Sequence, residues 1–228
     1  MRQINLRYVN ETYDDAGVLT SFGVRHPEDY NFAYDVVDDI ACEDPDRRAM
    51  VWCNPEGEEH IFTFADMKRW SDKAANYLAS AGIGKGDVVM VISRRHYQFW
   101  FIAIALHKLG AILLPATFML KEHDLTYRVA SSSAKAIVCT NVGEIAAVVD
   151  AVQPNCPSLE IKMILNGAGG GTLAGTAGAR VGAALSGPEG ICAAPAEREG
   201  WLDFNTGVRA SSEEFERVPT MAADPLLL

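Results

Sequence analysis

The chain has 228 residues, of which 49% are hydrophobic and 22% are charged, so it should fold around a sizeable core and is excluded from the disordered class. With 30 acidic residues against 20 basic ones, its formal net charge is -10. Most of the surface should therefore repel phosphate backbones and anionic membranes, and we expect no nucleic-acid partner.

Signals for membranes, export and metals are also missing from the sequence. No stretch reaches the roughly 18 consecutive apolar residues of a membrane span, and Met1 to Asn10 lack the apolar core of a secretory signal. The 5 cysteines include no Cys-x-x-Cys pair, and the 5 histidines show no metal-binding spacing, which indicates surface or interface histidines. The sequence predicts a cytoplasmic protein without a disulfide framework or a metal site.

Helix and strand signals alternate through the first two thirds of the chain. Apolar periodicity and turn residues predict helices over about 33–42, 64–81, 96–109, 122–131 and 144–152, and strands over 49–53, 60–64, 88–92, 111–114, 136–140 and 161–165. Wholly apolar strands such as 88–92 are typical of parallel sheets that are covered on both faces. The fold class is therefore α/β, a mostly parallel sheet flanked by helices.

The helix that begins after Thr63 has the clearest start and end. Asp66 stands three residues beyond Thr63, which is an acidic variant of the capping box. Apolar residues then recur every three or four positions as far as Ala81. Gly82 follows, and glycine is the residue that most often terminates a helix.

Composition divides the chain into four parts. We expect an N-terminal extension over 1–30, an α/β subdomain over 31–166, a flexible Gly/Ala-rich insertion over 167–197, and the start of the next subdomain over 198–228. In the last part, Ser211 and Glu214 predict a capping box and a short helix that Pro219 ends. Leu226 to Leu228 read as the start of a further strand.

Local motifs give two ligand-binding hypotheses and exclude one catalytic set. Gly169, Gly171 and Ala174 fit a loose dinucleotide fingerprint after a strand, although the glycines that follow weaken the helix that such a site needs. Arg94 and Arg95 follow a buried strand at the edge where α/β sheets bind ligands, or else they cap or solvate a loop. Ser131 to Ser133 lack a nucleophile elbow.

Several stretches together resemble a known superfamily. Phe62–Met67, a helix and Gly84–Val89 resemble the first core motif and following strand of the adenylate-forming (AMP-binding) ligases. Leu106–Pro115 resembles their second core motif, and Glu122–Arg128 and Ala134–Val138 continue the pattern in the same order and spacing.

Finer features of the resemblance point within this superfamily to the short-chain and medium-chain acyl-CoA synthetases. Met119–Lys121 and Tyr127–Arg128 look most like these enzymes, and Trp201–Leu228 looks like the stretch that precedes the ATP loop. The resemblance implies that this chain is the incomplete N-terminal part of the large domain. The resemblance covers about residues 30 to 165.

The resemblance implies activation of a carboxylic acid with ATP, Mg²⁺ and coenzyme A in the complete enzyme. The loop that would hold pyrophosphate, the acid that would grip the ribose and the C-terminal lysine are not in this sequence. We therefore expect no catalytic residues here, no tightly bound cofactor and no activity of this chain alone. By the same resemblance, Thr117, Phe118 and Met119 adjoin the coenzyme A tunnel.

Two other functions stay open at this point. The first is a non-catalytic α/β binding module that self-associates through exposed apolar surface. The second is a fragment of a nicotinamide-dependent oxidoreductase that uses Gly169 and Gly171.

Overall fold

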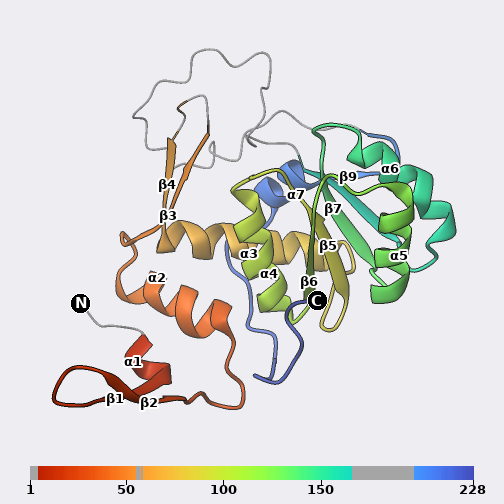
Figure 1. The fold of residues 1–228 in the computed structure, drawn as a ribbon. Coiled ribbons are helices and arrows are strands. Elements are labelled where there is room, and N and C mark those ends of the chain that lie inside the picture. Colours follow the sequence, from red (N-terminus) through yellow and green to blue (C-terminus); the bar gives the residue numbers. More distant parts are fainter. Residues whose placement is uncertain (1–4, 55–56, 58, 166–197) are drawn as a thin grey trace.

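The computed structural model describes residues 5–54, 57, 59–165 and 198–228. Its centre is a five-stranded sheet in the order β6-β5-β7-β8-β9, and every neighbouring pair in it is parallel (Figure 1). The strands are β5 Val88–Ile92, β6 Ile112–Ala116, β7 Ala136–Thr140, β8 Ile161–Leu165 and β9 Leu202–Asp203. The predicted α/β class with a parallel sheet is confirmed.

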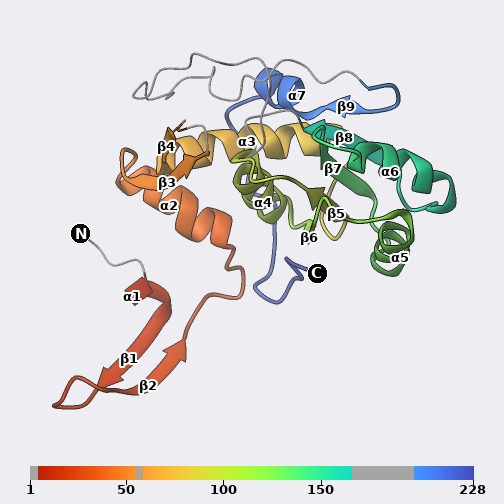
Figure 2. The ribbon, with the colours of Figure 1, turned by 45° about the horizontal axis from the view of Figure 1, so that its top comes forward.

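Helices cover both faces of this sheet. On one face lie α3 Phe64–Ser80, α4 Gln98–Leu109 and α7 Phe204–Ala210, and on the other lie α5 Glu122–Ser132 and α6 Ile145–Val152. Figure 2 shows α5 and α6 side by side at one end of the molecule. In β5, Val89 and Val91 pack under α4, whereas Met90 and Ile92 pack under α5 and α6. This division explains why the strand sequence is apolar at every position.

The ends of α3 and α4 form as their sequences predict. The Thr63 hydroxyl accepts a hydrogen bond from the Asp66 amide at 3.2 Å, and the Asp66 carboxylate accepts one from the Thr63 amide at 3.0 Å. Gly82, just past α3, has a φ of 94°, and Gly110, just past α4, has a φ of 67°. Both angles favour glycine, which has no Cβ to clash.

Two antiparallel hairpins precede the sheet. The strands predicted over 49–53 and 60–64 are present as β3 Arg48–Cys53 and β4 Glu59–Thr63, and they pair as a hairpin. The helix α2 Asp39–Glu43 links this hairpin to the π-helical segment Ala33–Asp38. A second hairpin, β1 Val9–Tyr13 with β2 Leu19–Val24, follows α1 Asn5–Tyr8 and was not predicted. Figure 2 shows it extending away from the sheet and its helices.

The prediction of a helix after Ser211 is wrong. The helix in this region is α7, which begins at Phe204 and ends at Ala210. The carboxylate of its N-cap, Asp203, accepts a hydrogen bond from the Thr206 amide at 3.1 Å. The backbone carbonyls that a later helix would need are bound by side chains of α3. Lys73 Nζ donates to the Ser211 carbonyl at 2.7 Å, and Asn76 Nδ2 donates to the carbonyls of Ser212 and Glu214.

The last residues add to the sheet beside β6. The Leu113 amide donates to the Leu226 carbonyl at 3.0 Å, and the Leu228 amide donates to the Leu113 carbonyl at 3.1 Å. These bonds form a parallel bridge between Leu113 and Leu227. The Gly/Ala-rich stretch with Gly169, Gly171 and Ala174 lies outside the described residues, and the division of the chain into four parts stays a prediction.

Candidate functional site

The loops that follow β5, β6 and β7 form one edge of the sheet. The register pairs Ile92 of β5 with Ala116 of β6 and with Cys139 of β7, so these three strands end at the same level. In open α/β sheets, ligands bind outside the carboxyl ends of the strands. The structure thus places both sequence candidates, Arg94–Arg95 and Thr117–Met119, at the edge where such sites occur.

Arg94 and Phe118 come together across two loops. The guanidinium carbon of Arg94 lies 4.6 Å from the centre of the Phe118 ring, which is within the range of a cation–π contact. The Thr117 hydroxyl accepts a hydrogen bond from the Met119 amide at 3.3 Å. Met119 itself is 68% exposed. The role of these three residues in binding coenzyme A stays a prediction.

Sequence analysis missed the position of His96, which it grouped with the surface histidines. His96 is buried, and its Nδ1 lies within hydrogen-bond distance of both the amide and the carbonyl of Arg94. Its Nε2 lies 3.3 Å from the hydroxyl of buried Thr140, at the end of β7. Burial lowers the pKa of His96, and the hydrogen bond with the Arg94 backbone opposes this only in part. The imidazole is therefore neutral near pH 7.

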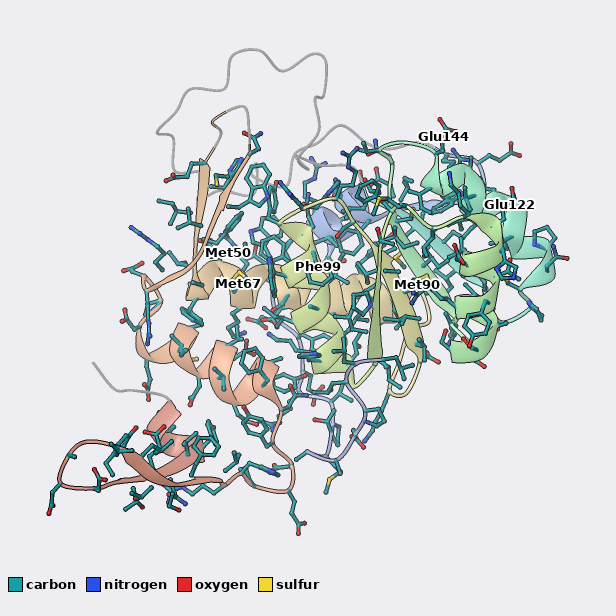
Figure 3. The ribbon with its side chains drawn as sticks, in the orientation of Figure 1. Met50, Met67, Met90, Phe99, Glu122 and Glu144 are labelled. Atoms are coloured by element: carbon teal, nitrogen blue, oxygen red, sulfur yellow. The ribbon has the colours of Figure 1, made fainter. Side chains whose placement is uncertain are left out.

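An aromatic cluster holds the loop between β5 and α4 in place. Trp52 Nε1 donates a hydrogen bond to the Arg95 carbonyl at 2.6 Å, and the Trp52 and Tyr97 rings are 5.5 Å apart, edge to face. Arg95 has a φ of 52°, a conformation that a non-glycine residue adopts only when its surroundings impose it. Phe99 lies on the first turn of α4 and packs against the same core (Figure 3).

A buried thiol, that of Cys139, lies near the end of β7. Burial raises the pKa of the Cys139 thiol to about 12, so this buried group stays protonated and is no nucleophile. In the described part of the chain, no group of three His, Cys, Asp or Glu side chains could hold a metal ion. Among the same residues, no helix has the length and hydropathy to cross a bilayer.

Comparisons with known proteins agree with this fold. A family model described as AMP-binding enzyme matches residues 37–191. Acyl-coenzyme A synthetase ACSM4, mitochondrial, of Mus musculus is 29% identical over 223 residues, which are 95% of this chain and 33% of that protein. Acyl-coenzyme A synthetase ACSM5, mitochondrial, of Homo sapiens is 30% identical over 208 residues, 89% of this chain and 31% of that protein.

Solved structures show the same architecture. The crystal structure of the anthranilate CoA ligase AuaEII in complex with anthranoyl-AMP matches with a TM-score of 0.63 at 20% identity, covering 89% of this chain and 32% of that one. This chain spans about a third of the length of the curated relatives that it matches. The core motifs Phe62–Met67 and Leu106–Pro115 fall inside the matched range. Because the family model covers more than half of the chain, the chain belongs to the AMP-binding enzyme family.

Proposed function

We propose that this chain is the amino-terminal part of an acyl-CoA synthetase and that it is inactive by itself. The observation that carries the proposal is the family match over residues 37–191, together with two relatives named as acyl-coenzyme A synthetases. Each relative is about three times as long as the stretch it shares with this chain. The missing length leaves room for the catalytic parts that the site lacks.

The reaction would proceed in two transfers. A carboxylate oxygen of the substrate attacks the α-phosphorus of ATP, the bond to the bridging oxygen breaks, and pyrophosphate leaves with that electron pair. The thiolate sulfur of coenzyme A then attacks the acyl carbon, and AMP leaves with the acyl–phosphate oxygen. Mg²⁺ would neutralise the phosphate charge in the complete enzyme. Among the described residues, no group of three His, Cys, Asp or Glu side chains could hold it. The substrate class proposed is a fatty acid of short or medium chain.

Within this reaction the chain would supply scaffold and part of a pocket. Thr117, Phe118 and Met119 lie at the carboxyl edge of the sheet, and Arg94 rests on the Phe118 ring. An accessible loop of this kind suits contact with the pantetheine arm of coenzyme A, which is uncharged and carries both methylene and amide groups. The anthranoyl-AMP held by the anthranilate CoA ligase supports the view that this architecture serves adenylate chemistry.

Isotope exchange tests the proposed inactivity. The purified chain is incubated with ATP, Mg²⁺, labelled pyrophosphate and each of a series of short-chain and medium-chain acids. We expect no label in ATP beyond that of a control without acid, because the described residues provide no catalytic set. Circular dichroism is measured in parallel to show that the chain is folded. Carboxylate-dependent exchange by the folded chain would falsify the proposal.

An alternative function, a non-catalytic module that self-associates, is favoured by one observation. The β1–β2 hairpin pairs Val9 with Val24 and Tyr13 with Leu19, and Tyr13, Leu19, Phe22 and Val24 are all exposed. Apolar side chains thus line one face of a hairpin that extends from the body. We expect concentration-dependent dimers in light scattering that Phe22→Ser weakens and Ser21→Ala, on the opposite face, does not. A monomer at every concentration would exclude self-association.

For the compartment we propose the cytoplasm. The described cysteines, Cys42, Cys53, Cys139 and Cys156, form no disulfide, which fits a reducing environment. The mitochondrial relatives named above work in a different compartment, so this assignment rests on cysteine chemistry alone.

A further inference from the structure

The β1–β2 hairpin is a separate small sheet with two open edges. Within the described residues, β1 and β2 pair with each other and neither pairs with a third strand. Figure 2 shows that the hairpin extends away from the body of the chain. A two-stranded hairpin alone is marginally stable in water and gains stability from further strands. We propose that two copies of this chain dimerise by antiparallel pairing of their β2 strands about a two-fold axis, which joins the two hairpins into one sheet.

The backbone groups of β2 that point away from β1 are those of Phe22 and Val24. The Arg25 amide donates a hydrogen bond to the Tyr8 carbonyl at 2.9 Å, so this pair is a hydrogen-bonded one. Hydrogen-bonded and non-hydrogen-bonded pairs alternate along an antiparallel ladder, which makes Val24 and Phe22 members of non-hydrogen-bonded pairs with β1. Their amides and carbonyls therefore face outward, where a second β2 strand can bind them.

A β-bulge determines the register of this pairing. The register of β1 against β2 shifts once, where β2 has an extra residue, Thr20. The regular stretch is thus 21–25, and its pairing with a second copy centres on Gly23. This register places Phe22, which is 59% exposed, opposite the partner's Val24, which is 65% exposed. Aromatic and β-branched side chains stabilise each other as cross-strand neighbours.

Charge favours the β2 edge over other modes of self-association. β2 contains no charged residue. β1 contains Glu11, which lies on the same face as Phe22, and its carboxylate accepts a hydrogen bond from the Tyr13 hydroxyl at 2.8 Å. Pairing of two β1 edges, or stacking of two apolar faces, would bring the Glu11 carboxylates of both copies together without a cation. Pairing through β2 leaves Glu11 on the outer strands, in contact with water.

The two ends of β2 carry opposite charges, which favours the antiparallel arrangement. Arg25 directly follows β2, and Asp14 and Asp15 lie in the turn that precedes it. Within the described residues, none of these three side chains forms an ion pair. Antiparallel pairing directs each Arg25 toward the turn of the partner, whereas parallel pairing would place the two acidic turns side by side.

Sedimentation equilibrium of the 228-residue chain and its variants tests the β2 pairing. We expect a monomer–dimer equilibrium whose dissociation constant rises at least about tenfold in Val24→Pro, because proline removes the outward amide in both copies and leaves the bonds to β1 intact. Glu11→Pro is the matched control, since Glu11 is paired with Phe22 and its amide faces outward at the opposite edge of the hairpin. It should leave the dissociation constant unchanged.

A cysteine at the two-fold axis keeps the test decisive if Val24→Pro does not fold. The two copies of residue 23 would form a non-hydrogen-bonded pair, in which the Cβ atoms are close enough for a disulfide. A Cβ added at Gly23 meets no atom within 4 Å. With oxidised glutathione, Gly23→Cys should form a covalent dimer at least about tenfold faster than the parent chain or Ser21→Cys, which lies away from the axis.

The outcomes separate this pairing from the functions proposed above. The pairing deepens the self-association considered as an alternative and does not rest on synthetase chemistry, so the isotope-exchange result has no bearing on it. A monomer at every concentration overturns both the pairing and self-association. A dimer that Val24→Pro leaves unchanged, that Glu11→Pro weakens equally, or that Gly23→Cys does not cross-link faster than Ser21→Cys overturns the pairing alone.

Discussion

Replacing Lys108 with methionine is expected to lower the free energy of unfolding by about 3–5 kcal/mol, because it leaves buried carboxylates without their counter-charge. The Lys108 side chain is completely buried, and its ammonium nitrogen lies 2.5 Å from Asp72 Oδ1 and 2.7 Å from Asp38 Oδ1. Asp72 is 1% exposed. Lys68 also pairs with Asp72, but it is 35% exposed and reaches only the other carboxylate oxygen.

This cluster joins three helical segments that are distant in the sequence. Asp38 ends the π-helical segment, Asp72 lies in the middle of α3, and Lys108 lies in the last turn of α4. Hydrogen bonds beside it tie the same segments together, since the Tyr34 hydroxyl donates to the Lys108 carbonyl at 3.0 Å. Loss of the ammonium should therefore loosen the packing of the π-helical segment on α3 and α4.

The pH dependence gives this prediction a second test. Burial raises the pKa of Asp38, and the charge of Lys108 opposes this only in part. Removing Lys108 should raise the pKa of Asp38 in the folded state further, because the opposing charge is lost. A group with a raised folded pKa favours the fold when it is protonated, and this contribution is lost as the pH rises through that pKa. The variant should thus lose most stability near neutral pH and approach the parent protein as the pH falls toward about 4.

Urea unfolding of parent and variant measures the difference. Lys121→Met is the matched control, because Lys121 is exposed and has no ion pair within the described residues. Its effect should stay within about 0.5 kcal/mol. Adding Asp72→Asn to Lys108→Met should recover part of the loss by removing one stranded charge. A loss below about 1 kcal/mol for Lys108→Met would show that the cluster is solvated.

Features determined by neighbouring residues could be predicted from the sequence. The apolar run of β5 and the Thr63–Asp66 capping box appear as expected, since each depends on residues within one turn or one strand. The predicted helix after Ser211 does not form, because a residue distant in the sequence determines the backbone there. Its capping signal is local, but Lys73, 138 positions away, binds the Ser211 carbonyl. A tertiary contact of this kind leaves no mark in the local sequence.

The candidate site also combines features that the sequence predicts with features that depend on tertiary contacts. The positions of Arg94 and Phe118 after two strands follow from the alternation of elements, whereas the contact between their side chains is seen only in the structure. The burial of His96 and its approach to Thr140 depend on how α4 sits on β7, 44 positions apart. Nor does the unpaired amide of Gln98 show in the sequence, where glutamine at the start of a helix looks like a surface residue.

A single methyl group added at Gly207 should destabilise the protein by about 2 kcal/mol, although the same change in an ordinary helix stabilises it by about 1 kcal/mol. Gly207 lies in the middle of α7, where a Cβ would overlap the Tyr77 ring of α3. The ring cannot easily move, since the Tyr77 hydroxyl donates to the Asp203 carbonyl at 3.1 Å and the Phe204 ring lies 6.1 Å away, edge to face.

A double-mutant cycle separates this clash from other causes. In a Tyr77→Leu background the flexible leucine can yield, so Gly207→Ala should cost at least about 1 kcal/mol less than it does beside tyrosine. Gly84→Ala is the control, because Gly84 has an ordinary backbone conformation and no atom within 4 Å of an added Cβ. Stabilisation by Gly207→Ala beside Tyr77 would mean that α7 does not pack this closely on α3. The stretch from Trp201 to Ala210 would then be attached to the sheet less firmly than its hydrogen bonds indicate.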